Sequence, residues 1–217
     1  MKYKAVLFDL DGTLLDTLED LADSMNAVLS ARGHPAHPVE KYRYFVGDGM
    51  EELARRTLPP AASGDQSEVK ACVLAMREEY GARWSNKTRL YPGIDELLDG
   101  LTGKGMILTV LSNKPDGFVK EIAAFFFSRW TFASTWGARP DVPRKPDPAA
   151  ALSISRAAKV GAPEFLYLGD TNTDMQTATA AGMYPVGALW GFRSEKELRE
   201  AGARSLAAYP TDVLKLV

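Results

Sequence analysis

Short apolar segments alternate with helical patterns over the second half of the chain, and this alternation constrains the fold more than any other feature. Continuous apolar runs of this length are typical of parallel strands that are covered on both faces. Strands joined by helices form βαβ units with right-handed crossovers. The sequence therefore predicts an α/β fold with a doubly wound, Rossmann-type parallel sheet. The predicted strands are residues 4–8, 106–111, 131–135, 165–168 and 185–189, and the predicted helices are residues 93–103, 115–127, 147–160 and 172–181.

A long stretch after the first predicted strand breaks this alternation, because it carries only helical signals. Glycine and proline residues separate its segments, as they commonly do at helix ends. We therefore expect an α-helical domain, residues 16–86, inserted into an α/β core formed by residues 1–15 and 87–217. The helical segments are residues 17–32, 38–45, 49–58 and 66–85.

The composition excludes several classes of protein. With 46% hydrophobic and 25% charged residues, the 217-residue chain is typical of a globular protein, and a net charge of −2 argues against a general nucleic-acid binder. No apolar run approaches the roughly 20 residues that cross a bilayer. Cys72 is the only cysteine, so we expect no internal disulfide and a cytoplasmic location. We expect neither nucleic acid nor membrane as a partner, and either a monomer or a homodimer.

Polar residues collect at the positions where the fold rule places a ligand. In an open parallel sheet, ligands bind beyond the carboxyl ends of the strands. Three predicted strands are followed there by acidic or hydroxyl residues, and a lysine precedes one of the later helices. The residues in question are Asp9, Asp11, Gly12, Ser112, Asn113, Lys145, Asp170 and Asp174.

The acidic residues in this group predict a metal site. Asp9 and Asp11 are two positions apart in an extended segment, so both can face the same crevice, and Asp170 approaches it from another strand. Three converging carboxylates would repel one another and raise one another's pKa. A hard divalent ion removes that conflict, and Mg²⁺ prefers carboxylate oxygens together with substrate phosphate. We therefore expect Mg²⁺ as the cofactor.

The first acidic loop also suits phosphoryl transfer. Asp9 could attack phosphorus and form an acyl phosphate, which divides one difficult hydrolysis into two easier steps. Asp11 could then act as general acid and general base. Gly12 lets the backbone approach closely, so that its N–H groups can hold phosphoryl oxygens.

The remaining polar residues suit the charge of the same transition state. Ser112 offers a hydroxyl, Asn113 a backbone N–H and Lys145 a positive charge. Asp174 could hold a metal-bound water or orient Lys145. Taken singly, each of these residues also fits a helix cap or a solvated loop. Their occurrence together, in this order, favours a catalytic site.

Four stretches of the chain resemble the four motifs of the haloacid dehalogenase-like hydrolase superfamily. They read "DLDGTLLDT", "LSNK", "RKPDP" and "GDTNTD". The resemblance implies Asp9 as nucleophile and Asp11 as general acid/base. It also implies a metal held by the Asp9 carboxylate, the Asp11 backbone carbonyl and Asp170, with Asp174 in support. The helical insertion resembles the small cap domain of one subclass.

Within this superfamily the chain is most similar to the phosphoglycolate phosphatase group. The similar stretches are "DTLEDLADSMNAVLSARG", "FVGDGMEELARR" and "WGFRSEKELREAGA". The second stretch predicts a turn at Gly47 and Gly49 that leads into a helix whose first turn could contact substrate. Arg55 or Arg56 could bind a second substrate anion such as a carboxylate, although a solvated helix face also explains them. The expected partner is a small phosphorylated metabolite, with 2-phosphoglycolate as the leading candidate.

Several alternatives share the same core. A pyrophosphatase, a nucleotidase and a sugar-phosphate phosphatase remain open. A β-phosphoglucomutase-like enzyme is less favoured, because "DTLEDLADSMNAV" lacks the histidine of the mutase cap. A non-catalytic phosphate-ester-binding protein is a more distant alternative, and the complete set of Asp9, Asp11, Lys145 and Asp170 argues against it.

Overall fold

A computed structural model describes residues 2–217, and they contain a six-stranded parallel sheet. The predicted doubly wound α/β fold is therefore confirmed. The spatial order of the strands is β5 (Phe132–Ala138), β4 (Ile107–Pro115), β1 (Ala5–Phe8), β6 (Phe165–Gly169), β7 (Tyr184–Ala188) and β8 (Ser205–Ala207).

β1 lies at the centre of the sheet, between β4 and β6. Phe8, its last residue, pairs with Val110 of β4 and with Leu168 of β6. The chain builds the sheet outward from β1 to β4 and β5, and then on the other side to β6, β7 and β8. The carboxyl end of β1 is thus the point at which the strand order reverses, where α/β sheets bind their ligands.

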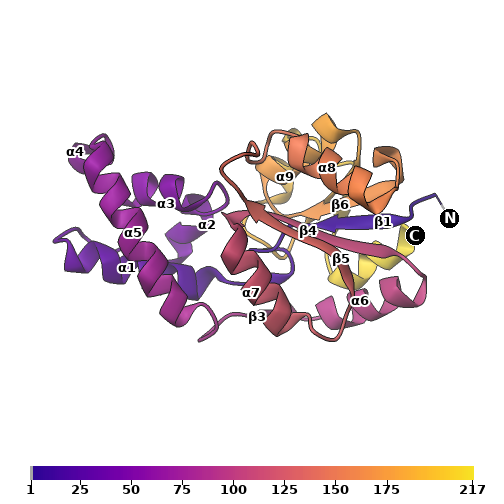
Figure 1. The fold of residues 1–217 in the computed structure, drawn as a ribbon, viewed down its shortest axis with the longest axis horizontal. Helices are drawn as coiled ribbons and strands as arrows, with labels where there is room; N and C mark the ends of the chain where they lie inside the picture. Colours follow the sequence, from indigo (N-terminus) through magenta and orange to yellow (C-terminus); the bar gives the residue numbers. More distant parts are fainter. Residues whose placement is uncertain (1) are drawn as a thin grey trace. The chain divides into compact units, whose positions relative to one another are not determined.

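Helices cover both faces of this sheet. Figure 1 shows α8 and α9 on one face and α6 and α7 on the other. A hydrophobic core fills the first interface, where Leu7 of β1 and Phe165 of β6 belong to the same cluster as Ile154 of α8. The helices of this unit are α6 (Ile94–Gly103), α7 (Asp116–Phe126), α8 (Ala149–Ala158), η2 (Ala162–Glu164), α9 (Asn172–Ala181), α10 (Glu195–Glu200) and η3 (Pro210–Lys215).

The described chain divides into two compact units. One comprises the N-terminal segment up to Asp16 together with Leu90–Val217, and the other comprises Thr17–Arg89. Apart from Arg89, the first residue of a short strand, the regular elements of the second unit are helices. A two-stranded sheet pairs β2 (Leu15–Asp16) with β3 (Arg89–Leu90). The helices of the second unit are α1 (Leu18–Ala31), η1 (Val39–Lys41), α2 (Tyr42–Phe45), α3 (Met50–Thr57), α4 (Pro60–Ser63) and α5 (Gln66–Arg83).

Some elements differ from those that the sequence predicts. β4 runs on through Ser112–Lys114 to Pro115, and its pairing with β5 is irregular between Leu111 and Pro115. The extension follows from main-chain pairing with β5, which resumes at Pro115 and Ala138. The polar side chains of this segment give no apolar pattern that would predict a strand. β8 is not predicted, because its three residues are too short to give an apolar pattern. A short helix, α4, lies between the predicted helical segments 49–58 and 66–85, where the sequence predicts no helix.

No helix among residues 2–217 is both long enough and apolar enough to span a membrane.

A buried carboxylate ties the first helix of the helical unit to the end of the same unit. Asp20, on α1, is only 2% exposed. It accepts hydrogen bonds from the backbone N–H groups of Lys87 (2.9 Å) and Thr88 (2.8 Å), and from the Thr88 hydroxyl (2.8 Å). These donors lie in a segment without regular secondary structure. Asp20 therefore supplies the hydrogen-bond acceptor that a helix or a sheet would otherwise provide.

We expect Asp20→Ala to lower the free energy of unfolding by about 3 kcal/mol, because it leaves buried donors without an acceptor. Urea denaturation measures this loss. Asp23→Ala is the matched control, since Asp23 is on the same helix but its side chain is 39% exposed and pairs with the Lys87 ammonium group. The control should change stability by less than about 1 kcal/mol. Equal losses in the two variants would contradict the assignment.

Candidate active site

Asp9 follows directly on β1 and lies at the centre of the site. Its backbone N–H donates to the Leu168 carbonyl of β6 at 2.9 Å, so the ladder of the sheet continues to this residue. Its carboxylate is buried, and Oδ1 accepts a hydrogen bond from the Lys145 ammonium group at 2.8 Å. The strand thus delivers a carboxylate to the switch point of the sheet.

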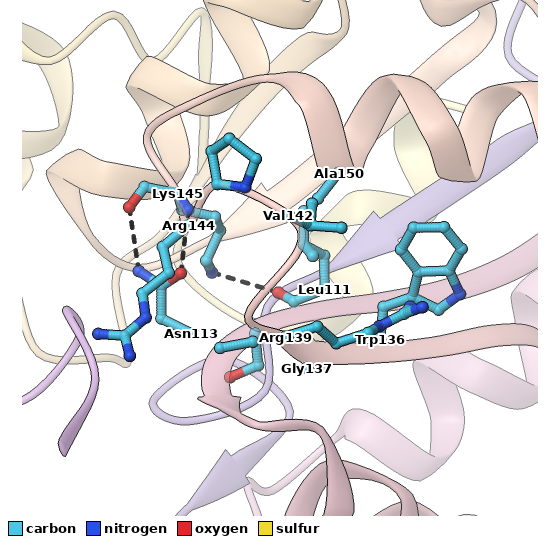
Figure 2. A pocket seen from close by; sticks show the side chains of 12 residues that line it. Leu111, Asn113, Trp136, Gly137, Arg139, Val142, Arg144, Lys145 and Ala150 are labelled. Carbon is cyan, nitrogen blue, oxygen red and sulfur yellow. Dashed lines mark hydrogen bonds between the residues drawn. The ribbon is translucent and has the colours of Figure 1, made fainter.

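Lys145 reaches this carboxylate from the loop before α8. Its Nζ also donates to Asp174 Oδ1 at 2.7 Å and to the Leu111 carbonyl at 3.2 Å. Asn113 holds the lysine backbone from both sides, because its side chain accepts from Lys145 N at 3.0 Å and donates to Lys145 O at 3.1 Å. Figure 2 shows the two bonds between Lys145 and Asn113 and the bond from Lys145 to the Leu111 carbonyl. The Asn113 side chain therefore positions the lysine loop, a role that the sequence does not predict.

Asp174 lies in the first turn of α9, and the residue that caps this helix, Thr171, holds its carboxylate in place. Asp174 Oδ2 accepts hydrogen bonds from the Thr171 hydroxyl at 2.7 Å and from the Thr171 N–H at 3.1 Å. The Asp174 N–H in turn approaches the Thr171 hydroxyl at 3.4 Å, which completes a capping box. Local helix capping thus orients the same carboxylate that contacts Lys145.

Asp170 is held by two segments that are distant in sequence. Its Oδ1 accepts from the Thr13 hydroxyl and its Oδ2 from the Phe192 N–H, both at 2.8 Å. Glycines make room for it: a Cβ on Gly12 would lie 2.3 Å from Asp170 Oδ2, and one on Gly191 would lie 2.2 Å from Asp170 Cβ. Gly12 also has a φ of +86°, a backbone angle that residues with a Cβ rarely adopt.

The electrostatics of this cluster follow from its burial. Burial, with the nearby Asp174 carboxylate, raises the pKa of Asp9 well above its usual range. The same two causes raise the pKa of Asp170 to about 7. Burial alone would lower the pKa of Lys145, but the carboxylates of Asp174 and Asp9 outweigh it and raise that pKa. Three carboxyl groups therefore lie around one contacting ammonium group, and their mutual repulsion favours the uptake of protons or of a cation.

This donor set fits a divalent cation. Oxygen atoms of Asp9, Asp170 and Asp174 all lie within 4.8 Å of one another, and all three residues are buried. Carboxylate oxygens are the ligands of hard cations such as Mg²⁺. The residues present can therefore hold such an ion.

Asp11 binds a different lysine. Its two carboxylate oxygens accept from Lys114 Nζ at 2.6 and 2.8 Å. The sequence predicts that Asp9 and Asp11 can face one crevice, and the structure pairs each of them with its own lysine. Lys114 belongs to the "LSNK" stretch, but its residue type alone does not reveal the pairing, which depends on the path of β4.

The other predicted residues occupy the following positions. The Ser112 hydroxyl is buried at the site end of β4 and accepts from Lys114 N at 3.2 Å. Ser112 also lines a cavity, together with Trp136, Arg139 and Arg144 (Figure 2). The cavity has room for about one water molecule. This cavity is therefore too small for a substrate.

The four predicted cap residues lie in the helical unit. Gly47 and Gly49 both have positive φ, and Gly49 directly precedes α3, as expected for a turn that leads into a helix. Arg55 pairs with Glu51 at 2.9 Å and with the Gln66 side chain at 2.5 Å, and Arg56 pairs with Asp48. Their contact with a substrate stays a prediction.

Several contributing residues are absent from the predictions. Thr13, Thr171 and Phe192 each hold an acidic residue of the site, and the Trp190 indole N–H donates to the Thr13 carbonyl at 2.9 Å. Thr171 is recognisable in retrospect from its capping box with Asp174. Phe192 is not recognisable, because it acts through its backbone.

Comparisons with known proteins agree with this geometry. The family profile described as "Haloacid dehalogenase-like hydrolase" matches residues 6–188. A phosphoglycolate phosphatase of Pseudomonas putida is 35% identical over 199 residues, which cover 87% of this chain and 70% of that protein. One from Haemophilus influenzae is 32% identical over 205 residues and 92% of each chain. A solved structure of a predicted phosphoglycolate phosphatase from Haemophilus somnus has a TM-score of 0.91 and 28% identity, and the match covers 100% of this chain and 98% of that one.

The chain belongs to the haloacid dehalogenase-like hydrolase family. Within this family it is a phosphatase, and its similarity to the phosphoglycolate phosphatase group is confirmed.

We expect Mg²⁺ to raise the melting temperature of EDTA-treated protein more at about pH 8 than at about pH 5. The raised pKa values of Asp9 and Asp170 mean that protons occupy the site at low pH, and the cation must displace them. Without the cation, the stability contributed by the raised pKa of Asp170 is present below about pH 4 and is lost as the pH rises through about 7.

Differential scanning calorimetry at several pH values measures this effect. At one hundred times the dissociation constant, the cation should add about 2.7 kcal/mol. Asp170→Asn should abolish the shift, whereas Asp212→Asn, a change to a carboxylate outside the site, should retain it. A shift that is independent of pH would contradict the assignment.

Proposed function

We propose that this chain is a cytoplasmic, Mg²⁺-dependent phosphomonoesterase that hydrolyses a small phosphorylated metabolite, 2-phosphoglycolate, through an aspartyl phosphate. The observation that carries the proposal is the contact of one buried lysine, Lys145, with both Asp9 and Asp174, beside the third carboxylate of Asp170. The names of the relatives support the substrate.

Asp9 and Asp170 would hold the Mg²⁺ ion, with the Asp11 backbone carbonyl as a further ligand and the nearby Asp174 carboxylate in support. When bound, the ion supplies positive charge to the phosphoryl oxygens and reduces repulsion between the phosphate and the carboxylates.

The first step transfers the phosphoryl group to Asp9. A carboxylate oxygen of Asp9 attacks phosphorus, the bond between phosphorus and the ester oxygen breaks, and Asp11 gives its proton to the departing alkoxide. Lys145 holds Asp9 Oδ1 and brings a positive charge beside the reacting atoms. The Ser112 hydroxyl and the Asn113 N–H are proposed to bind phosphoryl oxygens, together with the N–H groups around Gly12.

The second step returns Asp9 to its starting state. Water attacks phosphorus, Asp11 takes a proton from this water, and the bond between Asp9 and phosphorus breaks to release inorganic phosphate. An aspartic acid at position 11 suits this step, because the residue must accept a proton from water. Asp174 keeps Lys145 oriented through both steps.

The helical unit is proposed to act as a cap that closes over the substrate and excludes water until the phosphoenzyme forms. Gly47 and Gly49 would form the turn at which it meets the substrate, and Arg55 and Arg56 are its candidate anion-binding residues. The chain's single free cysteine accords with a reducing compartment.

We expect Asp9→Asn to lower kcat for p-nitrophenyl phosphate at least about 10³-fold, because an amide oxygen cannot serve as the nucleophile. A Mg²⁺-supported phosphate-release assay measures this loss, and EDTA should abolish activity of the wild type. Asp16→Asn, a change to a nearby carboxylate without a proposed catalytic role, serves as the control. Turnover that persists in Asp9→Asn or in EDTA would refute the mechanism.

A phosphate-release screen tests the substrate. We expect kcat/KM to be highest for 2-phosphoglycolate among 2-phosphoglycolate, pyrophosphate, sugar phosphates and nucleotides. If another compound has the highest kcat/KM, the assignment of 2-phosphoglycolate as substrate is wrong, whereas the proposed phosphatase mechanism is unaffected. Binding of phosphate esters without any turnover would favour a non-catalytic binding protein instead.

A further inference from the structure

We propose that Trp190 is a positioning residue of the metal site, which holds Asp170 in a fixed orientation through Thr13 and so makes the site selective for Mg²⁺ over the larger Ca²⁺. This inference rests on the proposed function, because it takes Asp170 as a ligand of the ion. It gives a role to the stretch "WGFR", which no step of the proposed mechanism uses.

The first observation is the hydrogen bond from Trp190 to the loop that follows β1. The indole N–H donates to the Thr13 carbonyl at 2.9 Å. Thr13 is fully buried and lies in a turn, outside the helices and strands. A buried carbonyl without a donor is costly, and a turn offers no regular ladder of donors. The indole N–H therefore fixes the peptide group of Thr13 in place.

The second observation is that the side chain of the same threonine contacts Asp170. The Thr13 hydroxyl donates to Asp170 Oδ1 at 2.8 Å, so a hold on the Thr13 backbone also limits the movement of this hydroxyl. The other oxygen of Asp170, Oδ2, accepts from the Phe192 N–H at 2.8 Å. The carboxylate therefore cannot rotate without breaking one of these bonds, and residues 190–192 contribute to both of them.

The third observation is the close packing of this loop. A Cβ on Gly191 would lie 2.2 Å from Asp170 Cβ, so the backbone between Trp190 and Phe192 passes directly against the acidic residue. A Cβ on Gly12 would lie 2.7 Å from Phe192 Cε2, so the Phe192 ring packs against the loop after β1. Asp170 thus lies between two loops, and the Trp190 hydrogen bond joins them.

The rigidity of a carboxylate ligand affects the two ions differently. Mg²⁺ requires a nearly ideal octahedral arrangement with short metal–oxygen distances, whereas Ca²⁺ accepts longer distances and a variable number of ligands. A carboxylate that is fixed before the ion arrives therefore favours Mg²⁺. Release of the Trp190 hydrogen bond should cost more affinity for Mg²⁺ than for Ca²⁺.

The test uses Trp190→Phe, which keeps an aromatic ring and removes the N–H donor. Melting temperatures of EDTA-treated protein at rising MgCl₂ or CaCl₂ give the two dissociation constants. We expect the dissociation constant for Mg²⁺ to rise about 10–100-fold, the usual effect of losing a residue that orients a metal ligand. The dissociation constant for Ca²⁺ should change less than about threefold.

Trp130→Phe is the matched control for this substitution. The Trp130 indole N–H also donates to an oxygen atom, at 2.7 Å, but its acceptor is the exposed carboxylate of Asp99 on α6, outside the site. The control should leave both dissociation constants unchanged.

A double-mutant cycle tests whether Trp190 acts through Thr13. Thr13→Val removes the hydroxyl that binds Asp170 and nearly preserves the volume of the side chain. Because the two residues are proposed to act in series, their effects should not add. Trp190→Phe in the Thr13→Val background should therefore weaken Mg²⁺ binding by less than about threefold. Thr13→Ser, which retains the hydroxyl, should retain the full effect of Trp190→Phe.

A measurement on the wild type covers the case in which Trp190→Phe does not fold. By thermodynamic linkage, a bond that strengthens binding of the ion is itself strengthened by the ion to the same degree. Mg²⁺ should therefore slow hydrogen exchange of the Trp190 indole N–H at least about tenfold. Exchange of the Trp130 indole N–H should not change. Nuclear magnetic resonance of ¹⁵N-labelled protein measures both.

Several outcomes would overturn the inference. Equal losses of Mg²⁺ and Ca²⁺ affinity in Trp190→Phe would show that Trp190 only stabilises the loop. A wild type that binds the two ions equally well would remove the selectivity that Trp190 is proposed to confer. If the wild type binds no Mg²⁺, the cofactor of the proposed function is wrong. If it binds Mg²⁺ and Trp190→Phe binds it equally well, only the present inference is wrong.

Discussion

The contact of Lys145 with Asp9 and Asp174 is the interaction on which the rest of the site depends. Three buried carboxylates would destabilise the fold if they stood together without positive charge. Lys145 offsets part of that repulsion, and its own position depends on Asn113, which holds the lysine backbone on both sides. A divalent cation among Asp9, Asp170 and Asp174 would offset the remainder. The arrangement that costs stability is thus the same one whose oxygen atoms fit a divalent cation.

The site depends equally on small residues and backbone groups. Asp170 fits only because Gly12 and Gly191 lack a Cβ, and its oxygens are oriented by the Thr13 hydroxyl and the Phe192 N–H. These contacts fix the direction of the carboxylate before any ligand arrives, which reduces the cost of ordering it on binding. The loop after β7 therefore helps to shape the site, through the Phe192 N–H and through the positive charge of Arg193, which lowers the pKa of Asp170.

Asp9 and Asp11 each pair with a separate lysine, so the two residues of the proposed mechanism lie in different environments. Asp9 lies in the buried cluster of carboxyl groups with Lys145, whereas Asp11 lies in a more open position with Lys114. This division suits one residue that attacks phosphorus and another that exchanges protons with a leaving alcohol and with water.

Much of the fold was predictable from local patterns. The central strand, the later strand–helix alternation and the helical insertion all follow from apolar runs and helix-end signals, which depend on neighbouring residues. β8 and the extension of β4 were not predictable, because main-chain pairing with a neighbouring strand decides them. Asp9, Lys145, Asp170 and Asp174 were predictable as site residues because their residue types match the chemistry.

The sequence by itself determined which chemistry the chain can perform, because acidic residues and a lysine follow successive strands of a predicted parallel sheet. Only the tertiary structure decided how these groups pair. Asp11 meets Lys114 and Asp9 meets Lys145 because β4 and the loop before α8 bring side chains together across more than a hundred residues. Such pairings depend on the path of the backbone in space, and a one-dimensional pattern does not contain it.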